Sequence, residues 1–157
     1  MQFTILSVGK INNECLSGVE EYSRRLAVYC KMNFVEIPEG DRHENVSTSE
    51  MEQLRIQEGR KILAQIKQEQ HVIVLTGEGV PWTPRKLSVQ IEHLSGTGRD
   101  EILFVIGGAF GLSEEVLERA NERLSLPKKE YPHQLARIVV MERLYRAFRM
   151  SLGEPLW

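Results

Sequence analysis

A run of five apolar residues followed at once by three glycines constrains this chain more than any other feature. The run covers residues 102–106, and the glycines are Gly107, Gly108 and Gly111. Five apolar residues are too few for an independent helix, but they suit a central parallel strand that is buried on both faces. Ser113 is a good helix N-cap, and the two glutamates after it favour a first turn. The stretch therefore predicts a strand, a glycine-rich turn and a helix.

The turn would lie at the carboxyl end of its strand, which is where open α/β sheets bind ligands. Glycine allows a backbone to bend sharply or to approach a ligand where a Cβ atom would clash. The spacing matches neither the dinucleotide pattern G-x-G-x-x-G nor the Gly-Lys-Ser/Thr ending of a P-loop. From the turn alone, a ligand site and a plain strand-to-helix connection are equal alternatives.

Strand and helix patterns alternate along the chain, which predicts an α/β fold with a parallel sheet between helices. We expect strands over residues 3–8, 33–37, 71–76 and 102–106. We expect helices over 15–29, from a capping box of Ser49 and Glu52, from Pro84 after the cap Thr83, after Ser113, and over 133–150.

Composition is that of a single globular domain, here residues 1–157, with 41% hydrophobic and 27% charged residues. No apolar run approaches a membrane span, and the N-terminus lacks the features of a signal peptide, so we expect a cytoplasmic protein. Cys15 and Cys30 are expected to be free thiols. The four histidines lack metal-ligand spacing, so no metal site is expected.

Charge is distributed unevenly along the chain. The net charge is −2, yet residues 124–150 carry +4 and residues 1–123 carry −5. A basic segment on an acidic body is the pattern expected where one face meets phosphates. A helix with solvated arginines is the alternative.

Five blocks of sequence, in this order, resemble one family. They are Leu75 with Gly79, residues 106–112, Leu124-Ser125, Tyr131-Pro132-His133, and residues 142–148. The family is the ribosomal RNA large-subunit methyltransferase H family of the SPOUT class, which methylates N3 of a pseudouridine in 23S rRNA. The similarity extends over nearly the whole chain, from Phe3 to Glu154.

The resemblance implies a SPOUT-type sheet with a deep C-terminal trefoil knot, in a region of about 72–150. It also implies a homodimer that binds S-adenosylmethionine in the knot and acts on 23S rRNA within the ribosome, without a membrane or a metal. The cofactor residues that it implies are Leu75, Gly107, Gly108, Leu126, Pro127, Lys128, Lys129, Glu130 and Tyr131.

Roles in the chemistry follow from the same resemblance. N3 of pseudouridine carries a proton that must leave before attack, and His133, with an ordinary imidazole pKa of about 6.5, is a candidate base. The equal alternative is that His133 caps the last helix. Arg137 would stabilise developing negative charge, or else form a buried ion pair with Glu142, for which a structural role is preferred. Lys128, Arg143 and Arg146 are expected to contact RNA phosphates. Trp82 either stacks on a base or, as the preferred alternative, covers the edge of the sheet.

Two features depart from the family pattern. Lys129-Glu130 stands where the family usually has Met-Thr, and Leu156-Trp157 ends the chain where the family has a Tyr-His pair. The second departure places the general base and RNA positioning in question. Three functions therefore stay open: the family activity, a cofactor- or ribosome-binding protein without turnover, and a SPOUT enzyme with another RNA target.

Overall fold

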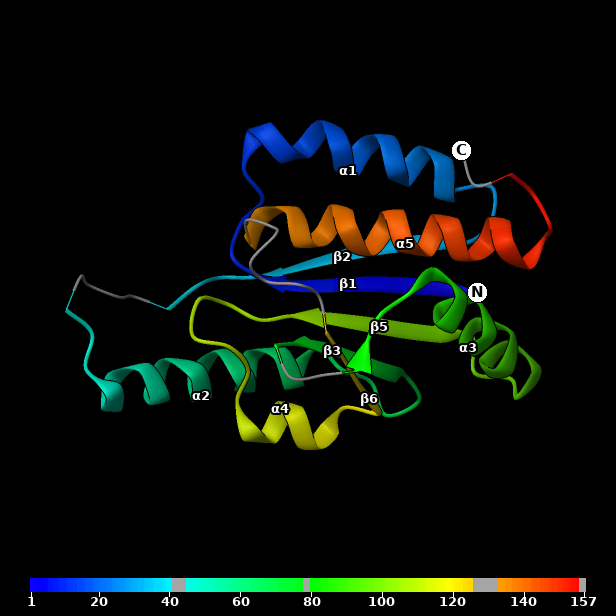
Figure 1. Ribbon diagram of the computed structural model, residues 1–157. Coiled ribbons are helices and arrows are strands. Elements are labelled where there is room, and N and C mark those ends of the chain that lie inside the picture. Colours follow the sequence, from blue (N-terminus) through cyan, green and yellow to red (C-terminus); the bar gives the residue numbers. More distant parts are fainter. Residues whose placement is uncertain (41–44, 78–79, 126–132, 156–157) are drawn as a thin grey trace.

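A parallel sheet organises the computed structural model, which describes residues 1–40, 45–77, 80–125 and 133–155. Within these ranges the sheet has six strands in the order β2-β1-β5-β3-β6-β4, and every neighbouring pair is parallel (Figure 1). The strands are β1 (Gln2–Val8), β2 (Lys31–Ile37), β3 (His71–Thr76), β4 (Val80–Pro81), β5 (Glu101–Ile106) and β6 (Glu122–Ser125). The predicted α/β class is confirmed.

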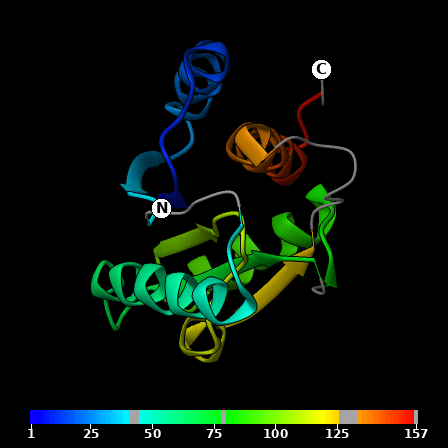
Figure 2. The same ribbon diagram turned by 90° about the vertical axis from the view of Figure 1, so that its left-hand side faces the viewer.

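Helices cover both faces of the sheet. Helices α1, α3 and α5 pack together on one face, and α2 and α4 lie together on the other (Figures 1 and 2). Their bounds are α1 (Asn13–Leu26), α2 (Thr48–Ala64), α3 (Pro84–Gly96), α4 (Glu114–Arg119), the 3-10 turn η1 (His133–Leu135) and α5 (Ala136–Ser151). Among the described residues, no helix is long and apolar enough to cross a membrane.

The strand β5 is the centre of a core with two sides, as its apolar run predicts. Alternate side chains face opposite layers, because successive residues of a strand point to opposite faces. Ile102, Phe104 and Ile106 pack with α1, α3 and α5, whereas Leu103 and Val105 pack with α2 and α4. Strands β1 and β3 divide in the same way on either side of β5. The middle of the sheet is therefore apolar on both faces.

Some predicted boundaries are wrong. The cap of α2 is Ser47, which accepts from the Glu50 amide, and not Ser49. The last helix begins with the 3-10 turn η1 before α5. The short strands β4 and β6 have no counterpart in the sequence-based expectation. The predicted knot depends on the path of residues 126–132, which lie outside the described residues.

The two cysteines are free thiols. Cys15 is buried, and Cys30 is half-buried just after α1. Burial raises the pKa of the Cys30 thiol to about 11, because the thiolate would lose its hydration. At neutral pH this thiol is therefore protonated and a poor nucleophile.

Gly59 lies where α2 crosses the start of α4, and we predict that Gly59→Ala destabilises the fold. An alanine Cβ would overlap the Ser113 Oγ atom and lie 2.9 Å from its Cβ, and Ser113 is itself buried. Overpacking of this kind costs about 1–3 kcal/mol, which exceeds the gain of up to about 1 kcal/mol in helix propensity. Urea denaturation measures the free energy of unfolding.

Gly96→Ala is the matched control for Gly59→Ala. Gly96 ends α3, and none of the described atoms lies within 4 Å of the position that an added Cβ would take there. This variant should be neutral or more stable by up to about 1 kcal/mol. Equal stability of the two variants would contradict the close packing of α2 on α4.

Candidate functional site

Three strands end side by side at the carboxyl edge of the sheet. Leu75 near the end of β3 lies opposite Ile106 of β5 on one side and Leu124 of β6 on the other. The three strands therefore end at one place, which brings Leu75 close to Gly107 and to Ser125. The other predicted cofactor residues, Leu126, Pro127, Lys128, Lys129, Glu130 and Tyr131, follow β6 directly but lie outside the described residues.

Packing within the chain already favours glycine in the turn after β5. A Cβ on Gly107 would lie 2.9 Å from Leu112 Cδ2, and one on Gly108 would lie 2.9 Å from Glu58 Oε1. Gly111 has φ +83°, which favours glycine, and its amide donates to the Gly108 carbonyl at 3.1 Å. The glycine content by itself thus does not demand a ligand, although the half-buried backbone of Gly107 and Gly108 remains partly open.

Arg137 is a buried clamp at the end of β1. Its guanidinium, 4% exposed, donates to Ser7 Oγ at 2.8 Å and to the Gly9 carbonyl at 2.6 Å. It also donates to Gln134 Oε1 at 3.2 Å and lies 3.6 Å from Glu36 Oε2. Burial lowers the Arg137 pKa, and Glu36 opposes that shift by stabilising the cation. This arginine stays charged, and it joins β1, β2 and the start of α5.

Of the two alternatives for Arg137, the buried ion pair with Glu142 is wrong. Glu142 lies 2.5 Å from Arg146 on the same helix, and Arg137 has Glu36 as its acidic neighbour. The reason is helical geometry, since residues four apart share a helix face and residues five apart do not. Glu142 therefore forms a partly exposed pair with Arg146 and not the buried pair that was its expected structural role.

The 3-10 turn η1 places the backbone of His133 at the same edge as the strand ends. Gln134 fixes this turn, because its amide donates to the Lys10 carbonyl at 2.9 Å and its oxygen accepts from the Asn12 amide at 3.1 Å. The N-cap of α5 is Leu135, which has no capping side chain, so His133 does not occupy the cap position. The side chain of His133 lies outside what the structure describes.

The two arginines expected to contact RNA differ in their surroundings. Arg146 is exposed and pairs with Glu142. Arg143 is half-buried, donates to the Trp82 carbonyl and lies with its guanidinium 5.8 Å from the Trp82 ring centre. Trp82 is only 3% exposed and packs on Phe104. Of its two predicted roles, covering the sheet is confirmed, because a buried indole has no free face for a base.

Sequence reasoning missed Gln134, Ser7 and Glu36. Each is an ordinary polar residue whose partners are distant in sequence, so no local pattern marks it. Only the contacts of the folded chain at the start of α5 reveal these three residues.

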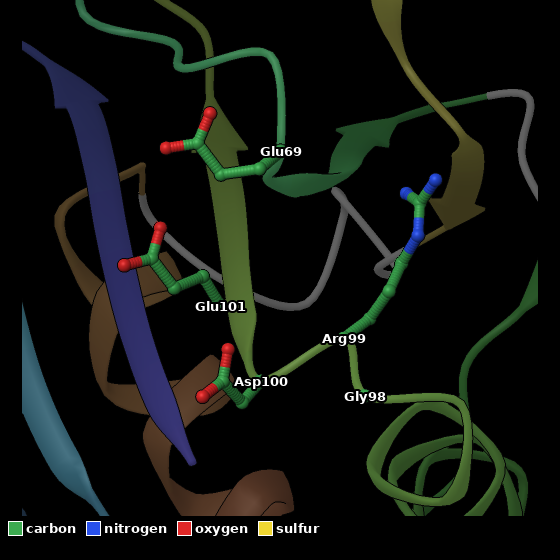
Figure 3. A pocket seen from close by; sticks show the side chains of 5 residues that line it. All are labelled: Glu69, Gly98, Arg99, Asp100 and Glu101. Carbon is green, nitrogen blue, oxygen red and sulfur yellow. The ribbon is translucent and has the colours of Figure 1, made fainter.

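A cavity of about 330 Å³ lies at the opposite, amino edge of the sheet. It is lined by Glu69, Gly98, Arg99, Asp100 and Glu101, and Figure 3 shows the three carboxylates on one side while Arg99 points away. Carboxylates repel phosphate, so this cavity does not suit an RNA contact. Within the described ranges, no group of three or more His, Cys, Asp or Glu side chains is placed to hold a metal ion.

We predict that Arg137→Met lowers stability by about 1–3 kcal/mol, because it leaves buried acceptors of β1 without a donor. Arg137→Lys should lose less, since an ammonium keeps the charge but cannot serve Ser7 and Gly9 as a planar fork. The measurement is urea denaturation.

Arg146→Met is the control for the Arg137 variants. Its exposed pair with Glu142 should contribute no more than about 1 kcal/mol. Equal losses from Arg137→Met and Arg146→Met would show that the buried hydrogen bonds of Arg137 stabilise the fold no more than the surface pair of Arg146 does.

Comparisons with known proteins agree on one family. A family described as "Predicted SPOUT methyltransferase" matches residues 1–156. The chain is 40% identical over 156 residues to the ribosomal RNA large subunit methyltransferase H of Exiguobacterium sibiricum, covering 99% of this chain and 98% of that protein. It is 42% identical, with the same coverage, to the protein of the same name from Shouchella clausii.

The fold comparison agrees with the sequence comparison. A solved structure of a probable methylase family protein from Haemophilus influenzae Rd KW20 superposes with a TM-score of 0.54 at 14% identity, covering 96% of this chain and 66% of that one. An identity this low speaks for the fold alone. The match of the family over residues 1–156, together with close relatives along the whole chain, places this protein in the SPOUT methyltransferase family.

Proposed function

We propose that this protein is an S-adenosylmethionine-dependent methyltransferase that modifies N3 of a pseudouridine in 23S rRNA, in the cytoplasm and on assembled ribosomes. The observation that carries the proposal is the 40–42% identity, over 99% of this chain, to proteins named ribosomal RNA large subunit methyltransferase H. The adjacent ends of β3, β5 and β6 support it, because they provide one edge for a ligand held by backbone groups.

The described residues fit such a cofactor. Gly107 and Gly108 offer partly open backbone groups beside Leu75, and the predicted residues 126–131 begin where β6 ends at the same edge. Leu75 is half-buried and could cover an apolar part of the cofactor. S-adenosylmethionine supplies a methyl group on a sulfonium, which is already electrophilic and needs no metal.

The remaining chemistry concerns the nucleophile. When bound, S-adenosylmethionine would supply the methyl group and its sulfur would keep the electron pair of the broken C–S bond, while the proton of N3 would pass to a base of this chain. We assign the base role to His133, and we assign to Arg137 and Gln134 the holding of η1 against the end of β1. Arg137 has four partners within the chain. We therefore assign it no direct contact with the substrate: it holds η1 in place, and its positive charge stabilises negative charge on the RNA base from a distance.

Basic residues would hold the RNA. Arg146 is exposed on α5, and Lys128 belongs to the segment after β6. Arg143 is half-buried and its Nη1 already donates to the Trp82 carbonyl, which leaves fewer of its donors for a phosphate contact. We therefore propose that Arg146 and Lys128 contribute more to RNA affinity than Arg143 does.

A homodimer follows if the chain end serves an active site. Arg149 donates to the Pro155 carbonyl and lies 3.1 Å from Glu154, and Tyr29 also hydrogen-bonds Glu154. This holds the tail at the far end of α5, whose 16 residues span about 24 Å from η1. We therefore propose that the tail serves the site of a second copy in a homodimer.

The second candidate function is a cofactor- or ribosome-binding protein without turnover. The chain ends in Leu156-Trp157 instead of a Tyr-His pair, which motivates this alternative. It predicts binding of S-adenosylmethionine with no methylated product.

The first experiment is transfer of labelled methyl from S-adenosylmethionine to ribosomes from a strain that lacks the modification, with free 23S rRNA alongside. We expect label on pseudouridine N3, located by nuclease digestion and mass spectrometry. Label on another RNA would favour a different target. Cofactor binding by calorimetry without label would favour the binding protein, and a graft of Tyr-His at positions 156 and 157 would then test whether turnover returns.

A pH–rate profile tests the base. If His133 accepts the N3 proton, the wild-type rate at saturating substrates should fall as the pH drops and the imidazole becomes protonated, because a protonated base cannot accept the N3 proton. His133→Gln should be slower by about 10²–10⁴-fold and should lack this limb. An unchanged profile in the variant would remove His133 from the base role.

A further inference from the structure

Helix α2, which lies outside the candidate site, contacts the turn after β5 and holds it in place. Arg55 of α2 donates from Nε to the Phe110 carbonyl at 2.9 Å. One helical turn further on, Glu58 lies against Gly108, with Oε1 2.9 Å from the position of a Cβ there. Helix α2 belongs to the layer opposite α5 (Figure 2). The candidate site is thus bounded by η1 on the side of the sheet that α5 covers. Its glycine turn is held by α2 on the opposite side.

The residues of α2 that contact the turn all lie on one face of the helix. Residues three and four apart lie on one helix face, and Arg55, Glu58 and Gly59 share the face that meets residues 108–113. Glu58 is 6% exposed, and its Oε2 also accepts from the Gly40 amide at 3.3 Å. A buried carboxylate and a half-buried guanidinium so placed fix both the position and the direction of the turn.

The hydrogen bond of Arg55 controls the orientation of one peptide unit. The Phe110 carbonyl and the Gly111 amide belong to the same peptide unit. That amide donates to the Gly108 carbonyl, and this hydrogen bond closes the turn. Rotating the Phe110–Gly111 peptide would move that amide and change which backbone groups of residues 107–111 face the cofactor edge. A charged donor on the carbonyl opposes this rotation, because charge-assisted hydrogen bonds are about twice as strong as neutral ones.

We propose that Arg55 is a positioning residue for cofactor binding, acting through the Phe110 carbonyl and touching neither cofactor nor RNA. This inference rests on the proposed function, since it assigns the turn of residues 107–111 to S-adenosylmethionine. Arg55 lowers the dissociation constant of the cofactor by keeping the turn in its binding conformation before the cofactor arrives.

The test compares Arg55→Met with Arg60→Met in the full-length protein. Arg60 lies on the same helix and is exposed, five residues beyond Arg55 and therefore on a different face. Calorimetry with S-adenosylmethionine should give a dissociation constant about fivefold to tenfold higher for Arg55→Met, the loss expected for one hydrogen bond. Arg60→Met should bind as the wild type does, and Arg55→Lys should recover part of the loss.

Two further readouts separate positioning from a general loss of structure. In ribosome methylation, Arg55→Met should raise KM for the cofactor and leave kcat at saturation within about twofold. Amide hydrogen exchange should accelerate at residues 107–113 in Arg55→Met and stay unchanged in Arg60→Met. A uniform rise in exchange across the chain would instead mark Arg55 as a stability residue and overturn the proposal.

The outcomes also distinguish this inference from the proposed function. If the wild type binds the cofactor and Arg55→Met binds it equally well, the inference fails and the proposed function stands. If the wild type binds no S-adenosylmethionine, both fail. Faster exchange at the turn with an unchanged dissociation constant also overturns the inference, because the turn would then be held by Arg55 without determining affinity.

Discussion

Burial of the sheet on both faces decides where polar chemistry can take place in this molecule. The middle strands present apolar side chains to helices on either side, and an uncompensated polar group there would cost several kcal/mol. The polar groups of the candidate site accordingly lie at the ends of the strands and on the helices that flank those ends. The carboxyl edge gathers the ends of β1, β3, β5 and β6 with η1, whereas the amino edge gathers the carboxylates of Glu69, Asp100 and Glu101, which repel phosphate.

Two arginines hold this edge together from opposite layers. Arg137 on α5 satisfies the end of β1, and Arg55 on α2 satisfies the carbonyl of Phe110 after β5. Both use a charged donor on a backbone acceptor, which is stronger than a neutral hydrogen bond. The comparison also explains why Arg143 and Arg146 differ from them: they lie further along α5, where one pairs with Trp82 and the other faces solvent.

Local signals were enough to predict the elements that depend on them. The apolar runs of β1, β3 and β5 and the caps Thr83 and Ser113 are all confirmed. Both kinds of signal are local, because a strand buried on two faces needs consecutive apolar residues and a cap needs a suitable side chain directly before its helix. The cap of α2 was misplaced because Ser47 and Ser49 each precede a glutamate by three residues, so the pattern is ambiguous. Strand β6 was missed because only Leu124 among its four residues is buried. The partners of Arg137 and Arg55 could not be predicted, since each contact joins residues far apart in sequence; the resemblance supplied the cofactor segments, which periodicity alone does not reveal.

The bond between Arg137 and Ser7 has a consequence for synthesis of the chain. The two residues are 130 positions apart, so the first strand leaves the ribosome well before the residue that secures its end. At about 5–20 residues per second, this delay is roughly 7–26 s. During that interval β1 can pair with β2, but its other neighbour β5 and the covering helix α5 are still to come. The nascent amino-terminal half must therefore stay free of aggregation with one apolar face uncovered, and the native structure can close only as the last helix emerges.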